Sequence, residues 1–185
     1  RGPFGKDEKG AFVIGRPGHE TGVKFGIVGG IAHPQINNDS VRRVPKIWAN
    51  TPSQFISYVS CHDDLCLTDR LKVTLPGASV LELKALQKLA ETAVFTSQGV
   101  PFIFAGDEIL RDRKGVVNAY NKPDEINAID WRNKTAYREV FDYVRGLIAM
   151  RKAHPAFRMG NADLIRKHLE FIHVPATNVV AFRIK

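Results

Sequence analysis

The sequence has no long hydrophobic run and few cysteines. No stretch approaches the roughly 18 consecutive apolar residues of a membrane span, and no charged and then apolar leader precedes a small-residue cleavage site. Cys61 and Cys66 lie too close in sequence to indicate a disulfide framework, so we expect free thiols. We therefore expect no membrane segment and no disulfide scaffold, and the compartment stays open.

The composition is that of a globular protein. Of the 185 residues, 44% are hydrophobic and 25% are charged, which is enough apolar material for one sizeable core and too little charge for disorder. The chain begins RGPFGKDEKG, without Met, and stops at VVAFRIK inside an apolar run. We expect it to be a piece of a longer protein.

Charge of one sign is in excess but is not clustered. The net charge of +8 raises the possibility of nucleic-acid binding, because Lys and Arg release counterions from phosphates. The basic residues are scattered, however, with short doublets such as Arg151-Lys152 and no long basic run. A nucleic-acid-binding domain would rest on net charge alone, so we expect no nucleic-acid partner.

A strand, a helix and a second strand are predicted in the middle of the chain. Residues 1–50 are rich in Gly and Pro and predict loops and short helices, with GVKFGIVGGIAH as a short buried element. QFISYVS predicts a buried strand, and Ser79 with Glu82 forms a capping box that opens a helix. Gly99 is expected to end that helix as a left-handed cap, and VPFIFA predicts a strand covered on both faces.

A long loop, a second helix and a β-rich tail follow. The loop is about 27 residues long, which is typical of functional loops. Asn133 or Thr135 is expected to cap the second helix, and His154-Pro155 to end it. The helix is expected to have an apolar stripe, formed by Tyr137, Val140, Phe141, Val144 and Ile148. LEFIHV and NVVAFRI predict two antiparallel strands. The order predicts an α/β fold with parallel strands, although the pattern alone does not separate a (β/α)8 barrel from a doubly wound sheet.

Both predicted parallel strands end in carboxylates. QFISYVS runs into His62, Asp63 and Asp64, which suit acid/base, nucleophilic or metal chemistry but also ordinary turn capping. A metal site with Cys61 and Cys66 matches no standard zinc spacing.

Asp107 and Glu108 follow the second strand. Adjacent carboxylates at a buried strand end need cationic or hydrogen-bonding partners, which Arg111 or Arg113 could supply. We expect a structural ion-pair network there rather than catalysis.

The loop segment NAYNKPDEINAIDW mixes amides, carboxylates and aromatic rings. Such groups bind sugar hydroxyls and stack on sugar faces, but Asn, Asp and Pro are also common loop residues. Composition leaves the two interpretations even.

These motifs together resemble glycoside hydrolase family 13, the α-amylase superfamily, and in particular its bacterial type I pullulanases. NTPSQFISYVSCHDD is similar to the seventh barrel strand with its HD motif, SQGVPFIFAGDEILR to the eighth strand, and NAYNKPDEINAIDW to the loop after it. RVPKIWANTP fits the approach to the seventh strand, and GLIAMRKAHPAFR resembles the last barrel helix. The resemblance runs from about Gly26 to the end.

The resemblance implies a partial (β/α)8 TIM barrel over residues 1–157 and the start of a C-terminal β-sandwich over residues 158–185. It implies a bacterial enzyme that hydrolyses α-1,6-glucosidic linkages in pullulan and starch-type glucans with retention, through two carboxyl groups about 5 Å apart. The family's nucleophile Asp and acid/base Glu match nothing in this chain, so the chain alone is expected to be inactive. The implied partners are an α-glucan and the missing N-terminal part of the barrel.

The resemblance also implies roles for individual residues. Asp63 corresponds to the family's transition-state stabiliser, with His62 and Asp64 beside the same sugar. Tyr120, Asn121 and Asp124 fall where the family lines outer glucose subsites. The chain has Asp64 where the family commonly has Asn, which puts fine substrate preference in doubt.

No metal site or cofactor is implied here, and calcium use by a longer protein stays open. The alternative function is a non-catalytic α-glucan-binding or scaffold module of the same fold.

Overall fold

The computed structural model describes residues 10–41, 44 and 46–185. The first nine residues of the chain, and Arg43 and Pro45 of the RVPKIWANTP motif, lie outside the described residues. The helices are α1 (Glu20–Ile27), α2 (Leu67–Thr74), α3 (Val80–Phe95), α4 (Asp124–Asn127), α5 (Asn133–Ala136), α6 (Arg138–Ala153) and α7 (Ala162–His168). The strands are β1 (Ile56–Ser57), β2 (Val100–Pro101), β3 (Leu169–Ile172) and β4 (Ala181–Ile184).

Short 3-10 turns complete the set: η1 (Phe12–Ile14), η2 (Asn38–Ser40), η3 (Pro52–Gln54), η4 (Asp107–Ile109), η5 (Ala119–Asn121) and η6 (Pro155–Arg158). The described residues among the first 50 thus form loops and short helices, as expected. Within the part of the chain that the structure describes, no helix is long and apolar enough to cross a membrane.

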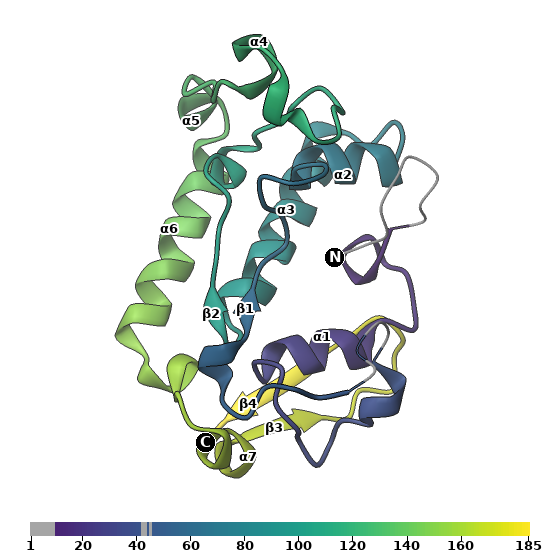
Figure 1. Cartoon of the computed structure of the whole chain (residues 1–185), viewed down its shortest axis with the longest axis vertical. Helices are drawn as coiled ribbons and strands as arrows, with labels where there is room; N and C mark the ends of the chain where they lie inside the picture. The colour runs from purple at the N-terminus through teal and green to yellow at the C-terminus, as the bar shows by residue number, and fades with distance from the viewer. Residues whose placement is uncertain (1–9, 42–43, 45) are drawn as a thin grey trace.

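The first strand pair is parallel, as expected for a βαβ unit. Ile56 pairs with Val100 and Ser57 with Pro101, and α3 lies between the two strands in sequence. The strands are shorter than the apolar runs predicted. Both run toward the end of the molecule that carries α2, α4 and α5, so their carboxyl ends meet there (Figure 1).

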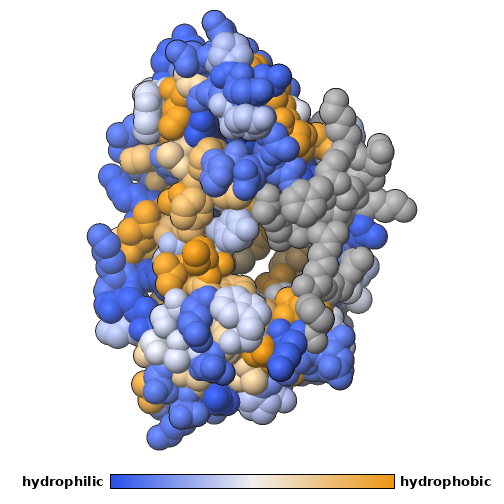
Figure 2. Space-filling view, viewed as in Figure 1, coloured by the Kyte–Doolittle hydropathy of each residue, from blue (hydrophilic) through white to orange (hydrophobic). Residues whose placement is uncertain are grey.

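The two parallel strands are covered on one face only. Ser57 is buried, whereas Ile56 is 57% exposed and its partner Val100 is 46% exposed. Phe102 is 40% exposed and packs edge-on against Tyr58, with ring centroids 6.1 Å apart. Apolar surface accordingly lies in the middle of the face shown in Figure 2, between hydrophilic ends. In this chain the prediction that VPFIFA is covered on both faces is therefore wrong, and QFISYVS is buried on one face only.

Helix α3 begins as the sequence predicts but ends differently. Ser79 accepts a hydrogen bond from Glu82 N, and the Glu82 carboxylate accepts one from Ser79 N at 2.8 Å. The helix stops at Phe95, and Gly99 is not among the residues with positive φ. A Cβ on Gly99 would lie 2.6 Å from the Phe55 carbonyl oxygen, so glycine is needed for close approach to β1 rather than for a left-handed cap.

Helix α6 packs along α3 through its predicted apolar stripe. Val140, Val144 and Leu147 are buried, and the last two share a cluster with Phe95. The helix ends at His154 as expected, but the expected caps are wrong. The N-cap positions of α5 and α6 are Arg132 and Tyr137, and neither makes a side-chain cap bond.

Arg151 of α6 is a buried residue that the pattern does not reveal. Its guanidinium donates to the carbonyl oxygens of Phe95 at 3.0 Å and Gly99 at 2.9 Å, and also to Ser97 O. These acceptors lie at the last residue of α3 and in the turn after it, so Arg151 satisfies carbonyls that this helix end leaves open. It thereby fixes the start of β2 relative to α6.

The C-terminal strands pair antiparallel, as predicted, with Leu169 opposite Ile184. They do not form a separate core in this chain. Leu169 and Phe171 of β3 share one apolar cluster with Phe25, Val28 and other residues of the first 50. The domain boundary between residues 157 and 158 stays a prediction.

Candidate functional site

The candidate site lies where β1 and β2 end. The chain passes from β1 through Ser60 to the segment Cys61–Asp64, and from β2 to η4 with Asp107. Figure 1 places both exits at the end of the molecule near α2 and α4. The structure therefore brings together the two carboxylate groups that the sequence placed at successive strand ends.

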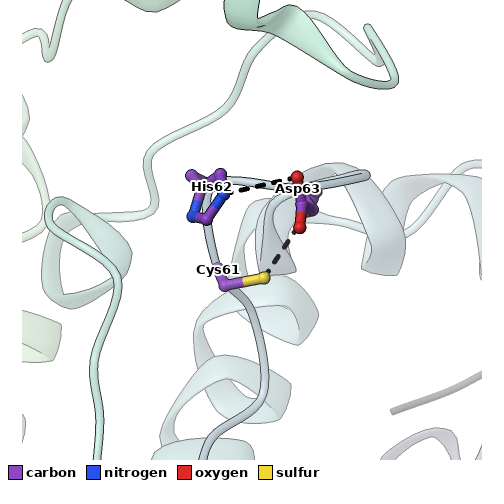
Figure 3. A group of neighbouring side chains, drawn as sticks. All are labelled: Cys61, His62 and Asp63. Carbon is purple, nitrogen blue, oxygen red and sulfur yellow. Dashed lines mark hydrogen bonds and ion pairs between the residues drawn. The ribbon is translucent and has the colours of Figure 1, made fainter.

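His62 and Asp63 face solvent. Their side chains are 80% and 68% exposed, and His62 Nε2 lies 3.4 Å from Asp63 Oδ1. Figure 3 shows the imidazole and the carboxylate close together, with Cys61 below them. Groups that contact a large polar ligand must be reachable from solvent, and these two are.

Asp64 points the other way. It is 5% exposed, and its Oδ2 lies 3.8 Å from Arg70 Nη2. Its φ of 64° is in the left-handed region, where Asp and Asn are the best tolerated residues after Gly. This conformation explains why either Asn or Asp suits the position, and it directs the Asp64 carboxylate into the protein rather than toward a ligand.

The segment is held by residues of the loop after β2. Asp64 N donates to Asn118 Oδ1 at 3.1 Å. Arg113, 2% exposed, donates from Nη1 to His62 O at 2.9 Å and from Nη2 to Asp64 O. The backbone on both sides of Asp63 is thus fixed, while its side chain stays in solvent.

Among the described residues, a hydrogen bond from Ser60 takes the place of the ion pairs expected for Asp107. Arg111 donates from Nη1 to Ala105 O at 2.9 Å and lies 4.6 Å from the centre of the Phe104 ring, and Arg113 binds the carbonyls named above. Asp107 Oδ2 instead accepts a hydrogen bond from Ser60 Oγ. Both guanidinium groups therefore serve the main chain rather than the carboxylates.

Asp107 and Glu91 are fully buried carboxyl groups. Burial raises the pKa of Asp107 to about 7, against the lowering effect of the Ser60 hydroxyl. Burial, and then the charges of Asp107 and Glu108, raise the pKa of Glu91 well above its ordinary value. Neither Glu91 oxygen has a hydrogen-bond partner among the described residues. The sequence signal for Glu91 was its place with Gln87 on the apolar face of α3.

Asp69 anchors the loop from the side of α2. Its carboxylate accepts hydrogen bonds from Arg113 N at 2.7 Å and Gly115 N at 2.9 Å, and from Cys66 Sγ at 2.9 Å. The thiol of Cys66 is buried and bonded to Asp69, and both thiols are free as expected. Sequence reasoning missed Asp69, because α2 was not predicted.

The loop after β2 presents its aromatic and polar side chains to solvent. Tyr120 is 85% and Trp131 is 59% exposed, and Asn121 and Asp124 are also exposed. Asn127 folds the loop on itself by donating to Ala119 O at 2.7 Å and Lys122 O at 2.8 Å. The amides of this loop thus divide into structural ones, Asn118 and Asn127, and an outward one, Asn121.

Comparison with known proteins identifies relatives over most of the chain. No protein-family model matches the chain. The pullulanase of Bacillus subtilis strain 168 is 39% identical over 133 residues, which are 72% of this chain and 18% of that protein. Its type I pullulanase structure, complexed with maltose, covers 94% of this chain and 23% of that chain, with 34% identity and a TM-score of 0.82.

Other solved pullulanases agree. The apo pullulanase of Paenibacillus barengoltzii covers 96% of this chain and 26% of that chain, with 44% identity and a TM-score of 0.85. The same enzyme is solved in complex with maltohexaose and α-cyclodextrin, with a TM-score of 0.84. The chain thus spans about a quarter or less of the length of these relatives.

The shared fold and sequence define the class: the chain belongs with the glycoside hydrolases. Within that class it is type I pullulanase-like, in agreement with the family 13 resemblance of its motifs.

Proposed function

We propose that the chain forms one wall of the substrate cleft in a debranching enzyme that hydrolyses α-1,6-glucosidic linkages of pullulan and starch-type glucans with retention. The observation that carries the proposal is the solvent-facing His62–Asp63 pair at the end of β1, in a segment that superimposes on pullulanases. The complexes of the Paenibacillus enzyme with maltohexaose and α-cyclodextrin support an α-glucan as the ligand.

Asp63 is proposed to accept hydrogen bonds from sugar hydroxyls and to stabilise positive charge that develops in the transition state. His62 donates to the same sugar. Tyr120 offers its ring for stacking, and Asn121 and Asp124 offer polar groups to outer glucose units, which their exposure permits. Asp64 takes the role of a positioning residue, because its carboxylate faces Arg70.

The nucleophile and the acid/base are proposed to come from other parts of a longer protein, so this chain alone is inactive. The exposed apolar face of β1 and β2, with Ile56, Val100 and Phe102, supports a barrel in which further strands cover that face. Residues 1–157 then belong to the barrel and residues 158–185 to the start of a β-sandwich. The missing N-terminal part of the barrel is the proposed partner of the apolar face.

The test is hydrolysis of pullulan by the longer protein, with the anomeric configuration of the first product followed by NMR. We expect α-anomeric reducing ends to appear first, because retention through a covalent intermediate preserves the α-configuration. The 185-residue chain alone should release no reducing ends. A longer protein that binds maltohexaose without cleaving pullulan would contradict the proposal and favour the non-catalytic binding module.

A further inference from the structure

Three consecutive residues after β1 bring together three different metal-ligating atoms. Cys61 Sγ, a ring nitrogen of His62 and a carboxylate oxygen of Asp63 all lie within 4.8 Å of one another. Figure 3 shows them grouped on one turn of the chain. We propose that Cys61, His62 and Asp63 form a binding site for a divalent cation of the Zn²⁺ class.

The spacing of two of the ligands already suits such an ion. Zinc bonds of about 2.0–2.2 Å to nitrogen and oxygen in a tetrahedral arrangement require the two ligand atoms to lie about 3.3 Å apart. His62 Nε2 and Asp63 Oδ1 lie 3.4 Å apart. A Zn–S bond of about 2.3 Å requires the sulfur to lie about 3.6 Å from the others. Cys61 can approach by rotation about its Cα–Cβ bond, because its side chain is only partly buried.

The backbone that carries the ligands is fixed before any ion binds. Arg113 Nη1 donates to His62 O at 2.9 Å, and Asp64 N donates to Asn118 Oδ1 at 3.1 Å. Both contacts use main-chain atoms and leave the three ligating side chains available. Binding therefore costs little main-chain conformational entropy. The solvent-exposed side of the turn leaves the fourth coordination position for water.

The donor set selects the kind of ion. A thiolate, an imidazole and one carboxylate suit Zn²⁺, Co²⁺ or Cu²⁺, whereas Mg²⁺ and Ca²⁺ prefer oxygen ligands alone. Cys66 is not a ligand, because it is buried and donates to Asp69 Oδ2 at 2.9 Å. Binding converts the Cys61 thiol to a thiolate and releases one proton to solvent, so affinity rises with pH.

Occupation of this site has a functional consequence that rests on the proposed function. The ion would engage the side chains of His62 and Asp63, which are the two groups proposed to contact the sugar at the bond to be cleaved. Zn²⁺ would then compete with the glucan. The free thiol of Cys61 would make glucan binding sensitive to this class of metal.

The test is a titration of the 185-residue chain with Co²⁺ as the spectroscopic substitute for Zn²⁺. A phosphine reductant is present to keep the thiols reduced. We expect one Co²⁺ per chain, a thiolate-to-cobalt charge-transfer absorption in the near ultraviolet, and its loss on addition of one equivalent of Zn²⁺. Cys61→Ser should abolish the absorption. His62→Asn and Asp63→Asn should each weaken binding by about 10-fold to 100-fold or more, because even loss of an outer-shell partner has that effect.

Cys66→Ser is the matched control and should leave the absorption unchanged. An absorption that is absent in the unmodified chain, or that survives Cys61→Ser, would overturn the proposal. If the His62→Asn and Asp63→Asn variants bound Co²⁺ as tightly as the unmodified chain, the proposal would also be overturned, since the metal would then bind a thiol alone. All of these readouts are independent of hydrolysis, so failure of the proposed enzyme activity does not affect them. In an active longer protein, Cys61→Ser should raise the Zn²⁺ concentration needed for inhibition at least 10-fold.

Discussion

The ends of β1 and β2 both carry carboxylates, but in opposite environments. Asp63 after β1 is largely exposed beside an exposed imidazole, whereas Asp107 after β2 is fully buried under Ser60. Only a group in solvent can meet a polysaccharide, and a buried acid with a raised pKa contributes instead to folding energetics. Position at a strand end therefore does not assign a role, and burial separates the two carboxylates.

The largest expected effect comes from Asp63, the exposed carboxylate after β1. Asp63→Asn in the longer protein should lower kcat for pullulan hydrolysis on the order of 10²-fold to 10³-fold, because a preorganised electrostatic contact to the transition state is lost. KM should change much less. Asp163→Asn on α7 makes the same chemical change on an exposed side chain outside the site and serves as the control. A kcat within a factor of three of the unmodified enzyme would rule out the assigned role.

Arg113, in the loop after β2, binds the turn after β1, so its removal should disturb the structure at both strand ends. Arg113→Met leaves His62 O and Asp64 O without their donors and should lower the free energy of unfolding by about 2–4 kcal/mol. Denaturant unfolding measures this loss. Arg132→Met is the control, because this arginine side chain is 90% exposed. Its free energy of unfolding should change by no more than about 0.5 kcal/mol. Equal effects of the two variants would show that Arg113 does not hold the turn.

Because Asp107 after β2 is buried, the free energy of unfolding should fall as pH rises. Because the pKa of Asp107 is raised to about 7, the folded protein binds more protons than the unfolded chain between about pH 4 and pH 7. The contribution of Asp107 is therefore complete below pH 4 and is lost as pH rises through 7. Between pH 5 and pH 8 the loss should be about 2–3 kcal/mol.

Unfolding of the Asp107→Asn variant checks this assignment. The variant keeps an oxygen for the Ser60 hydroxyl but no longer titrates, so its stability should depend less on pH between 5 and 8 than that of the unmodified protein. An unchanged pH profile in Asp107→Asn would assign the effect to Glu91 alone.

The smallest expected effect concerns Asp64, which lies between the two ends. Asp64→Asn keeps a side chain that tolerates φ of 64° and should change stability by less than about 1 kcal/mol. Asp64→Ala should cost about 1–2 kcal/mol, because alanine is strained in the left-handed region. Thermal unfolding distinguishes the two. Equal losses for the Asn and Ala variants would show that the charge facing Arg70 matters more than the backbone conformation.

The elements with strong local signals could be predicted from the sequence. The capping box of Ser79 and Glu82, the stripe of α6 and the pairing of β3 with β4 depend on neighbours in the chain, and each is confirmed. The meeting of the two strand ends also followed from parallel pairing.

Other features depend on contacts between distant residues. Gly99 accommodates the Phe55 carbonyl, and Arg151 binds carbonyls more than 50 positions away. The inward direction of Asp64 follows from its φ and from Arg70, neither of which any local pattern reveals. The sequence could therefore locate the candidate site but could not divide its carboxylates into exposed and buried ones.

Carbodiimide labelling of carboxylates, read by mass spectrometry with and without maltohexaose, tests this division most directly. In the longer protein, Asp63 should be labelled in the absence of glucan and protected in its presence, while Asp107 and Glu91 should stay unlabelled in both conditions. Labelling of Asp63 that maltohexaose leaves unchanged, or labelling of Asp107 that maltohexaose suppresses, would contradict the account.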